Sequence, residues 1–277
     1  MKKDQKKIPF SKMHGAGNDY IYIDCMESEP ESPDTLAREI SDRHTGVGGD
    51  GIVMICPSDK ADFRMRIFNA DGSEARMCGN ASRCIAKYVI DQGLTDRTDL
   101  TLETLSGIRR LMARKGSDGK VESVTVDMGR PEVGVVDTEV ALPDGSRHRL
   151  TAVSMGNPHG VIFTDDLSDA MVLGHGPELE RHPMWPDRAN IEFARTDAPD
   201  RITMRVWERG SGETMACGTG ACATLVAAAT NGLAGRKAEI SLPGGRLTIE
   251  WLPESEGGHV MMTGPATEVF TGTYIRN

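Results

Sequence analysis

Apolar and polar residues alternate along several short stretches of the chain, which is the pattern of a strand with one buried face. The alternation is clearest in Phe63-Arg-Met-Arg-Ile-Phe68 and in Ile202-Thr-Met-Arg-Val-Trp207. Two longer stretches, 79–92 and the Ala-rich 218–231, are predicted to be helices. A glycine follows each of them directly, where a left-handed residue commonly ends a helix. The pattern therefore predicts a strand-rich chain with one long helix in each half.

Shorter stretches predict the remaining elements. A short helix is expected over 34–42, with Pro33 or Asp34 at its start. Residues 1–10 are expected to form a frayed tail or a weak first strand. Further strands are expected at 20–24, 51–55, 100–104, 109–113, 121–128, 160–163, 238–242, 247–251, 260–262 and 266–275. Strands joined by turns, with one long helix per half, indicate an α/β (α+β) fold in which a mostly antiparallel sheet curls around each helix.

The two halves repeat each other at a fixed offset of 139 residues. Self-similarity at one offset indicates a duplication. It predicts two pseudo-symmetric lobes, 1–130 and 146–265, with the active site in the cleft between them. The final strand, 266–277, could stay in the second lobe or return to the first. The matched pairs include Cys78-Gly79 with Cys217-Gly218, Asn18 with Asn157, Arg66 with Arg205, Glu74 with Glu213, and Gly93 with Gly232.

Composition and charge narrow the classes of function. Of 277 residues, 38% are apolar and 26% are charged, as in an ordinary soluble globular chain. The net charge of −9 argues against nucleic acid as the main partner. No apolar run reaches the roughly 18 residues of a membrane-spanning helix, and the Lys-rich start lacks the apolar stretch of a signal peptide. We therefore expect a cytoplasmic protein without a membrane partner.

Six cysteines raise the question of disulfides. Three bridges would suit a secreted chain, but a chain of this length can fold without them, and the absence of a signal peptide favours reduced thiols. Cys25, Cys56, Cys84 and Cys222 are expected to be small buried apolar residues. The remaining two, Cys78 and Cys217, stand at equivalent loop-to-helix junctions.

These two junctions carry the candidate chemistry. A helix start offers free N–H groups and a partial positive charge, so we expect both thiols to titrate below their ordinary pKa of about 8.5. One thiolate could remove an α-proton while the other thiol protonates the opposite face of the same carbon. The carbanion's charge would spread onto a carboxylate held by both helix starts, so no cofactor is required. The backbone N–H groups expected to bind that carboxylate belong to Gly79, Asn80, Gly218 and Thr219.

Three other functions have partial support in the sequence. A zinc site normally shows short Cys-x2-Cys pairs, whereas the spacings here are Cys78-x5-Cys84 and Cys217-x4-Cys222, so no metal is expected. A redox disulfide between Cys78 and Cys217 would lack the usual Cys-x-x-Cys motif. Gly46-Val-Gly-Gly-Asp-Gly51 matches the dinucleotide pattern, but it precedes a predicted strand instead of opening a helix.

Polar residues near the junctions fit the capture of a zwitterion. Arg209 could fork onto a second carboxylate, Glu208 could hold an ammonium group or tune a thiol, and His159 could assist thiol ionisation. Asn18, Asn69, Asn157 and Asn190 could donate and accept hydrogen bonds. Each Asn could equally be a turn or cap residue, and His159 could be a structural histidine.

The chain resembles diaminopimelate epimerase, a cofactor-independent two-cysteine enzyme family of lysine and peptidoglycan synthesis. The resemblance runs through nearly the whole chain. It rests on Lys12-Met-His-Gly-Ala-Gly-Asn-Asp19, Arg43-His-Thr-Gly-Val-Gly48, Phe68-Asn-Ala-Asp-Gly-Ser-Glu74, Met77-Cys-Gly-Asn80, Ser154-Met-Gly-Asn-Pro-His159, Val206-Trp-Glu-Arg-Gly-Ser-Gly-Glu-Thr214, Ala216-Cys-Gly-Thr-Gly-Ala-Cys222, Leu242-Pro-Gly-Gly245 and Met262-Thr-Gly-Pro265.

This resemblance implies epimerisation of LL- to meso-diaminopimelate, a small dicarboxylic diamino acid. It implies that Cys78 and Cys217 are the acid/base pair and that His159 and Glu208 adjust the thiols. It also implies closure on substrate and a homodimer. The residues that would hold the substrate are Asn18, Asn69, Asn157, Asn190, Glu208 and Arg209, with the backbones of Gly79-Asn80 and Gly218-Thr219.

Two alternative functions stay open, and the chain departs from the family's sequence pattern at two places. The chain could racemise another amino acid on the same fold, or it could bind an amino acid without catalysis. Some family members carry Gln where this chain has Gly51, and the usual Cys-Gly-Asn-Gly becomes Cys78-Gly-Asn-Ala81 here.

Overall fold

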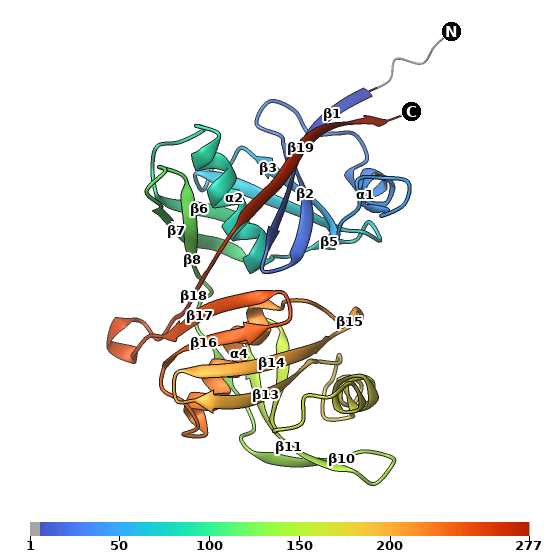
Figure 1. Cartoon of the computed structure of the whole chain (residues 1–277), viewed down its shortest axis with the longest axis vertical. Helices are drawn as coiled ribbons and strands as arrows, with labels where there is room; N and C mark the ends of the chain where they lie inside the picture. The colour runs from blue at the N-terminus through green and yellow to red at the C-terminus, as the bar shows by residue number, and fades with distance from the viewer. Residues whose placement is uncertain (1–5, 277) are drawn as a thin grey trace. The chain divides into compact units, whose positions relative to one another are not determined.

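The structure, a computed structural model, describes residues 6–276, and the chain divides into two compact units. The first unit runs to Val126 and takes up the chain again from Pro265, and the second is Asp127–Gly264. Figure 1 shows the first in blue to green with the red final strand, and the second in green to orange. The last strand, whose place the sequence left open, thus belongs to the first unit. Among the described residues, no helix is long and apolar enough to cross a membrane.

The first unit is a mixed, mainly antiparallel sheet with two helices. β1 pairs antiparallel with β2 and with β19, β2 is parallel to β3, β3 is antiparallel to β4, and β4 is parallel to β6. β6, β7 and β8 continue as an antiparallel meander. The elements are β1 (Lys6–Gly15), β2 (Asn18–Asp24), α1 (Pro33–Ser41), β3 (Gly51–Cys56), β4 (Phe63–Asn69), β5 (Glu74–Ala75), α2 (Gly79–Asp91), β6 (Asp99–Thr104), β7 (Gly107–Lys115), β8 (Val121–Asp127) and β19 (Thr267–Arg276).

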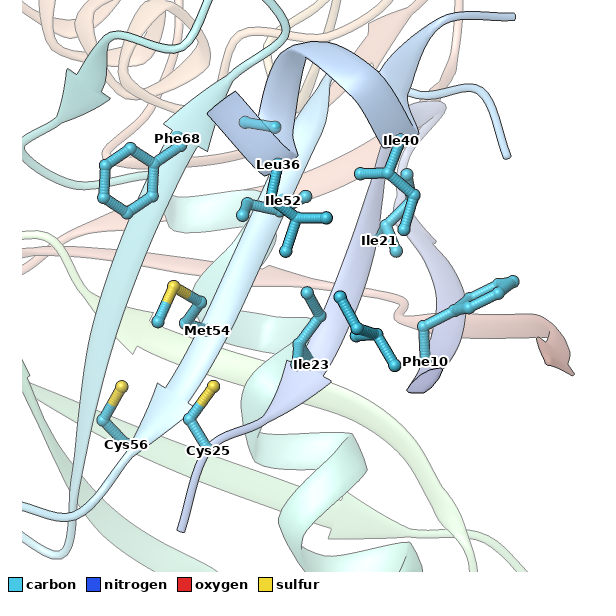
Figure 2. Packing of buried hydrophobic residues seen from close by; sticks show 12 residues of the cluster. Phe10, Ile21, Ile23, Cys25, Leu36, Ile40, Ile52, Met54, Cys56 and Phe68 are labelled. Atoms are coloured by element: carbon cyan, nitrogen blue, oxygen red, sulfur yellow. The ribbon is translucent and has the colours of Figure 1, made fainter. Parts of the chain in front are cut away.

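A hydrophobic core fixes α1 on this sheet. Leu36 and Ile40 project from the buried side of α1, and Figure 2 shows them close to Ile21 and Ile52 on the strands. The thiols of Cys25 and Cys56 belong to the same cluster. Cys84 and Cys222 are likewise buried and form no disulfide, so the prediction of four small buried cysteines is confirmed.

The second unit repeats this order. β11 pairs antiparallel with β12, β12 is parallel to β13, β13 is antiparallel to β14, and β14 is parallel to β16. β16, β17 and β18 form the closing meander. The elements are β9 (Glu132–Val133), β10 (Thr138–Ala141), β11 (Arg147–Ser154), β12 (Pro158–Phe163), the π-helix η1 (Ala170–His175), α3 (Gly176–Glu180), β13 (Asn190–Ala198), β14 (Arg201–Glu208), β15 (Gly212–Glu213), α4 (Gly218–Thr230), β16 (Lys237–Leu242), β17 (Gly245–Trp251), the 3-10 helix η2 (Glu254–Glu256) and β18 (Val260–Gly264).

The repeat extends to details of geometry, and the predicted fold class is confirmed. Both long helices end in the same way, since Gly93 and Gly232 have φ of 75° and 70° and donate to carbonyls of the last helical turn. The Arg66–Glu74 ion pair of the first unit recurs as Arg205–Glu213 in the second. In each unit this pair ties the strand before the cysteine loop to the short strand that follows it.

Six strands lie outside the sequence prediction: the short β5, β9, β10 and β15, and the longer β11 and β13. β11 was not predicted, although alternate residues along it are buried. β13 was missed because its first five residues are all buried, which hides the two-residue period. The first strand begins at Lys6, and the predicted tail before it lies outside the described residues.

Candidate active site

Cys78 caps the N-terminus of α2. Its backbone is extended (φ −138°, ψ 118°), and its Sγ accepts a hydrogen bond from the backbone N–H of Ala81 at 3.4 Å. A side-chain acceptor at this position satisfies one of the free N–H groups of a helix start. The predicted loop-to-helix junction is therefore confirmed, with the thiol in the first turn of the helix.

Asn18 holds the Cys78 thiol from the neighbouring strand. Cys78 Sγ donates to Asn18 Oδ1 at 3.4 Å, while Asn18 Nδ2 donates to Asp50 Oδ2 at 2.8 Å. Asp50 in turn accepts from Arg43 Nη2 at 3.1 Å. Burial, followed by the nearby Asp19 carboxylate, raises the pKa of Asp50 above its usual range. The sequence prediction missed Asp50, which fixes the direction of the Asn18 amide.

The other first-unit residues lie around the same helix start. Asn80 is buried, and its Oδ1 accepts from Arg83 Nη2 at 2.9 Å. Asn69 ends β4 and donates from Nδ2 to Ser73 Oγ at 3.0 Å. The N–H of Gly79 belongs to the first turn of α2. The structure therefore brings Asn18, Cys78, Gly79 and Asn80 together, and it places Asn69 at the end of the strand that leads to this loop.

Cys217 occupies the equivalent place in the second unit. It is the N-cap of α4 (φ −115°, ψ 110°), and its Sγ accepts from the N–H of Gly220 at 3.3 Å. Thr219 Oγ1 lies 3.5 Å from this sulfur and accepts from Asn157 Nδ2 at 3.4 Å. Gly218 opens the helix between them.

Electrostatics at Cys217 differ from the prediction. Burial raises the pKa of the Cys217 thiol well above its ordinary value, and the carboxylates of Glu208 and Glu192 raise it further. The hydrogen bonds from Thr219 and Gly220 oppose this shift but do not overcome it. The expectation that both helix starts lower the pKa of their thiols is thus wrong for Cys217, because desolvation outweighs the helix dipole.

Two carboxylates, Glu208 and Glu192, act on the Cys217 thiol, and His159 lies against Glu192. Burial raises the pKa of Glu208, whose Oε1 accepts from Thr214 Oγ1. His159 is fully buried, and its Nδ1 lies 2.7 Å from Glu192 Oε1. His159 and Glu208 are among the residues predicted from the sequence, whereas Glu192 is not. The same offset of 139 residues could have revealed it, since it matches Glu192 to the apolar Val53.

Asn190 and Arg209 form a separate corner of the second unit. Asn190 Oδ1 accepts from the backbone N–H of Arg209 at 3.0 Å, and its Nδ2 donates to Pro158 O at 3.0 Å. The Arg209 guanidinium donates to the Asp187 carboxylate at 2.9 Å. Asn190 thus positions the backbone of Arg209, and the Arg209 guanidinium is paired with the carboxylate of Asp187.

The predicted site residues therefore fall into two groups, one in each unit. Within each group a thiol caps a helix and side-chain amides lie nearby. Among residues 6–276, no group of three or more His, Cys, Asp or Glu side chains could hold a metal ion. The arrangement offers two thiols as proton carriers and two sets of helix N–H groups for an anion.

The family model for diaminopimelate epimerase matches residues 10–134 and 151–269. The chain belongs to the diaminopimelate epimerase family. It is 56% identical to the diaminopimelate epimerase of Bacteroides thetaiotaomicron, over 96% of this chain and 97% of that one. It is 53% identical to that of Phocaeicola vulgatus, over 96% and 97%. Membership of this family makes the chain an isomerase.

Solved structures support the fold of this epimerase. A hydroxyproline epimerase from Agrobacterium vitis superposes with a TM-score of 0.72 at 17% identity, over 97% of this chain and 92% of that one. A PhzF family phenazine biosynthesis protein from Bacillus anthracis gives 0.73 at 18%, over 97% and 99%. At such low identity the likeness extends to the fold alone.

Proposed function

We propose that this protein interconverts LL- and meso-diaminopimelate without a cofactor, using Cys78 and Cys217 as the two proton carriers. The observation that carries the proposal is the repetition of one device: a cysteine whose sulfur caps the first turn of a helix at the same offset in both units. Buried structural cysteines have no reason to recur at both helix starts. The family membership supplies the reaction and the substrate.

The contacts of the thiols suggest how the proton moves. The Cys78 thiol donates to Asn18 Oδ1, and the Cys217 thiol lies close enough to Glu208 for that carboxylate to raise its pKa. Since burial raises the pKa of Glu208, this carboxylate is a suitable acceptor for the Cys217 proton. The resulting Cys217 thiolate would take the α-proton from one face, and the Cys78 thiol would deliver its proton to the other face. The reverse reaction exchanges these roles.

The helix starts would stabilise the intermediate. Proton removal places negative charge on Cα and on the adjacent carboxylate. The N–H groups of Gly79-Asn80 and Gly218-Thr219 are suited to that carboxylate, because fixed dipoles in a dry site stabilise charge without reorganising. Arg209 would bind the second carboxylate in place of Asp187, with Asn69, Asn157 and Asn190 completing the contacts.

The remaining expectations form part of the same proposal. The pathway would be lysine and peptidoglycan synthesis in the cytoplasm. A homodimer is supported by β19, a long strand on which the apolar side chains of Val269, Phe270 and Ile275 are exposed. A racemase of another amino acid is the competing function, but a substrate with one carboxylate would bring no group to replace Asp187 on Arg209.

The decisive experiment follows isotope exchange in deuterium oxide. The purified protein should place deuterium at Cα of diaminopimelate while interconverting its isomers, and it should leave histidine, lysine and proline unchanged. Cys78→Ala and Cys217→Ala should each lose inversion by at least about a thousandfold, within the range that acid–base catalysis supplies. Cys222→Ala, a buried cysteine one turn into α4, is the matched control and should retain activity. Full inversion by either active-site variant would end the two-thiol mechanism.

A further inference from the structure

Glu192 forms a fully buried pair with His159. Neither side chain is exposed to solvent (0% each), and Glu192 Oε1 lies 2.7 Å from His159 Nδ1. The outer atoms of the pair, Glu192 Oε2 and His159 Nε2, are buried and have no hydrogen-bond partner among the described residues. Burying an ionisable pair whose remaining polar atoms make no hydrogen bond lowers the stability of the fold. Such a pair therefore calls for a functional explanation.

The strand register places this pair in the active site. In the parallel β12–β13 ladder, His159 pairs with Asn190 and Val161 with Glu192. Successive side chains of a strand alternate between faces, so His159 and Glu192 share one face. In the antiparallel β13–β14 ladder, Glu192 pairs with Val206, which puts Glu208, two residues on, on that face as well.

The start of α4 lies against the same face. A Cβ built on Gly220 would come within 2.6 Å of Glu192 Oε1 and 3.3 Å of Cys217 Sγ. The carboxylate and the thiol therefore flank one glycine. Four titratable groups form this cluster: His159 from β12, Glu192 from β13, Glu208 from β14 and Cys217 from the N-cap of α4.

The duplication provides an internal comparison. The first unit has the same register, with Tyr22 paired to Val53 and Val53 to Ile67, at the offset that relates them to Val161, Glu192 and Val206. Val53 is fully buried. An apolar side chain thus fits this place in the fold, and the fold itself does not require a carboxylate at Glu192.

We infer that Glu192 is a positioning residue for the isomerisation: it accepts the Nδ1–H of His159, so that His159 Nε2 carries no proton and can accept one in the cluster that also holds Glu208. This inference rests on the proposed function. The carboxylate also keeps negative charge beside Cys217, which holds that thiol protonated until substrate enters. Glu192 need not touch the substrate in either role.

The test compares two variants at this position. Glu192→Gln keeps an acceptor for His159 Nδ1–H and removes the charge, whereas Glu192→Val copies the residue of the first unit and removes both. Nitrogen-15 NMR of histidine-labelled protein, with the His159 resonances assigned by His159→Gln, reports which ring nitrogen carries the proton. We expect the Nδ1–H form in the wild type and in Glu192→Gln, and its loss in Glu192→Val.

Two further readouts separate positioning from simple destabilisation. Thiolate absorbance, taken as the difference from the matching Cys217→Ser protein, should show the Cys217 titration at lower pH in both variants, because a negative charge is gone. We expect kcat to fall about 10- to 100-fold in Glu192→Val, below the range that acid–base catalysis itself supplies, and the acid limb of the pH–rate profile to move in Glu192→Gln.

A matched control is available in the same unit. Glu180 is also a buried carboxylate, but it accepts from Trp207 Nε1 and the N–H of Gly210 instead of a histidine. Glu180→Gln should leave the His159 tautomer and the Cys217 titration unchanged. An unchanged His159 tautomer in Glu192→Val, or an unchanged Cys217 titration in both variants, would overturn the inference. Neither readout needs turnover, so an inactive wild type would refute the proposed function alone.

Discussion

At the scale of single residues, the Cys78 thiol depends on a carboxylate that it does not touch. Asp50 Oδ2 accepts from Asn18 Nδ2, and this bond directs Asn18 Oδ1 toward the sulfur. An amide that lost this partner could turn its NH2 group toward the sulfur. It would then stabilise the thiolate instead of accepting from the thiol.

Asp50→Asn tests this dependence. The new amide can still accept from Asn18, but it carries no charge and can also donate, so the direction of Asn18 is no longer fixed. We expect the pKa of the Cys78 thiol to change by about one unit, which corresponds to about 1.4 kcal/mol. The value of kcat should therefore fall about tenfold, and the pH–rate profile should shift. Asp118→Asn, in an exposed turn, is the control. Equal profiles for the Asp50 variant and the wild type would contradict this account.

At the scale of elements, the sequence predicted the parts with strong local patterns. The two long helices and their glycine ends followed from the local sequence, because the left-handed turn after each helix needs only local hydrogen bonds. β13 could not be predicted in this way, because both of its faces are covered and its polar residues, Asn190 and Glu192, point inward. The cysteine pair was predictable from repetition.

The missed site residues share a cause. Asp50 and Glu192 act through a second side chain, Asn18 and His159 respectively. Their partners come from distant parts of the chain, so the spacing of the residues gives no hint of the contact. The lowered pKa expected for Cys217 failed for a related reason, since burial of the helix start depends on the packing of the whole unit.

Gly51 offers a test at the junction of two strands. It has φ of 154°, and a Cβ there would lie 2.0 Å from Phe68 O and 2.9 Å from Asn69 Cα. Because both atoms belong to backbone, the neighbouring strand must shift to accept a side chain. The backbone at this position therefore favours glycine.

Gly51→Ala should therefore destabilise the protein by more than about 2 kcal/mol, above the 1–2 kcal/mol of left-handed strain alone, and it should impair substrate binding through Asn69. Gly93→Ala is the matched comparison, since that glycine has φ of 75° and nothing within 4 Å of an added Cβ. Its cost should stay near 1 kcal/mol, with activity retained. Thermal melting and KM measure both effects, and equal costs at the two glycines would contradict the steric argument.

At the scale of the whole molecule, the duplication gives both units the same fold but surrounds their two thiols with different side chains. The offset of 139 residues matches His159, Asn190, Glu192 and Glu208 of the second unit to Tyr20, Gly51, Val53 and Asn69 of the first. The first unit thus gives its thiol a neutral amide partner, and the second surrounds its thiol with titratable groups. A two-base reaction needs one ionised and one neutral thiol, and unequal surroundings favour such a state.

The buried acids of the whole chain also predict how its stability changes in alkali. Burial raises the pKa of Cys84 to about 11, and it raises the pKa values of Tyr22 and Cys217 as well. A thiol in the unfolded chain ionises near pH 8.5. Above that pH the unfolded chain binds fewer protons than the folded protein, so the free energy of unfolding falls as pH rises. This stabilisation is complete below about pH 8.5 and is lost toward pH 11. Cys25 and Cys56 share a hydrogen bond that raises the pKa of Cys25 and lowers that of Cys56, so the two contributions of this pair oppose each other.

Cys84→Ala isolates one contribution to this trend. A rise in the pKa of Cys84 from about 8.5 in the unfolded chain to about 11 in the folded protein corresponds to roughly 3.5 kcal/mol across the window, at roughly 1.4 kcal/mol per unit. The cavity left by the missing sulfur costs the same at every pH, so it lowers the melting temperature uniformly. The loss of the titration instead flattens the dependence on pH. Melting temperatures of the variant and the wild type between pH 8 and 11 should therefore converge as pH rises, whereas parallel curves would mean that Cys84 ionises as readily in the folded protein as in the unfolded chain.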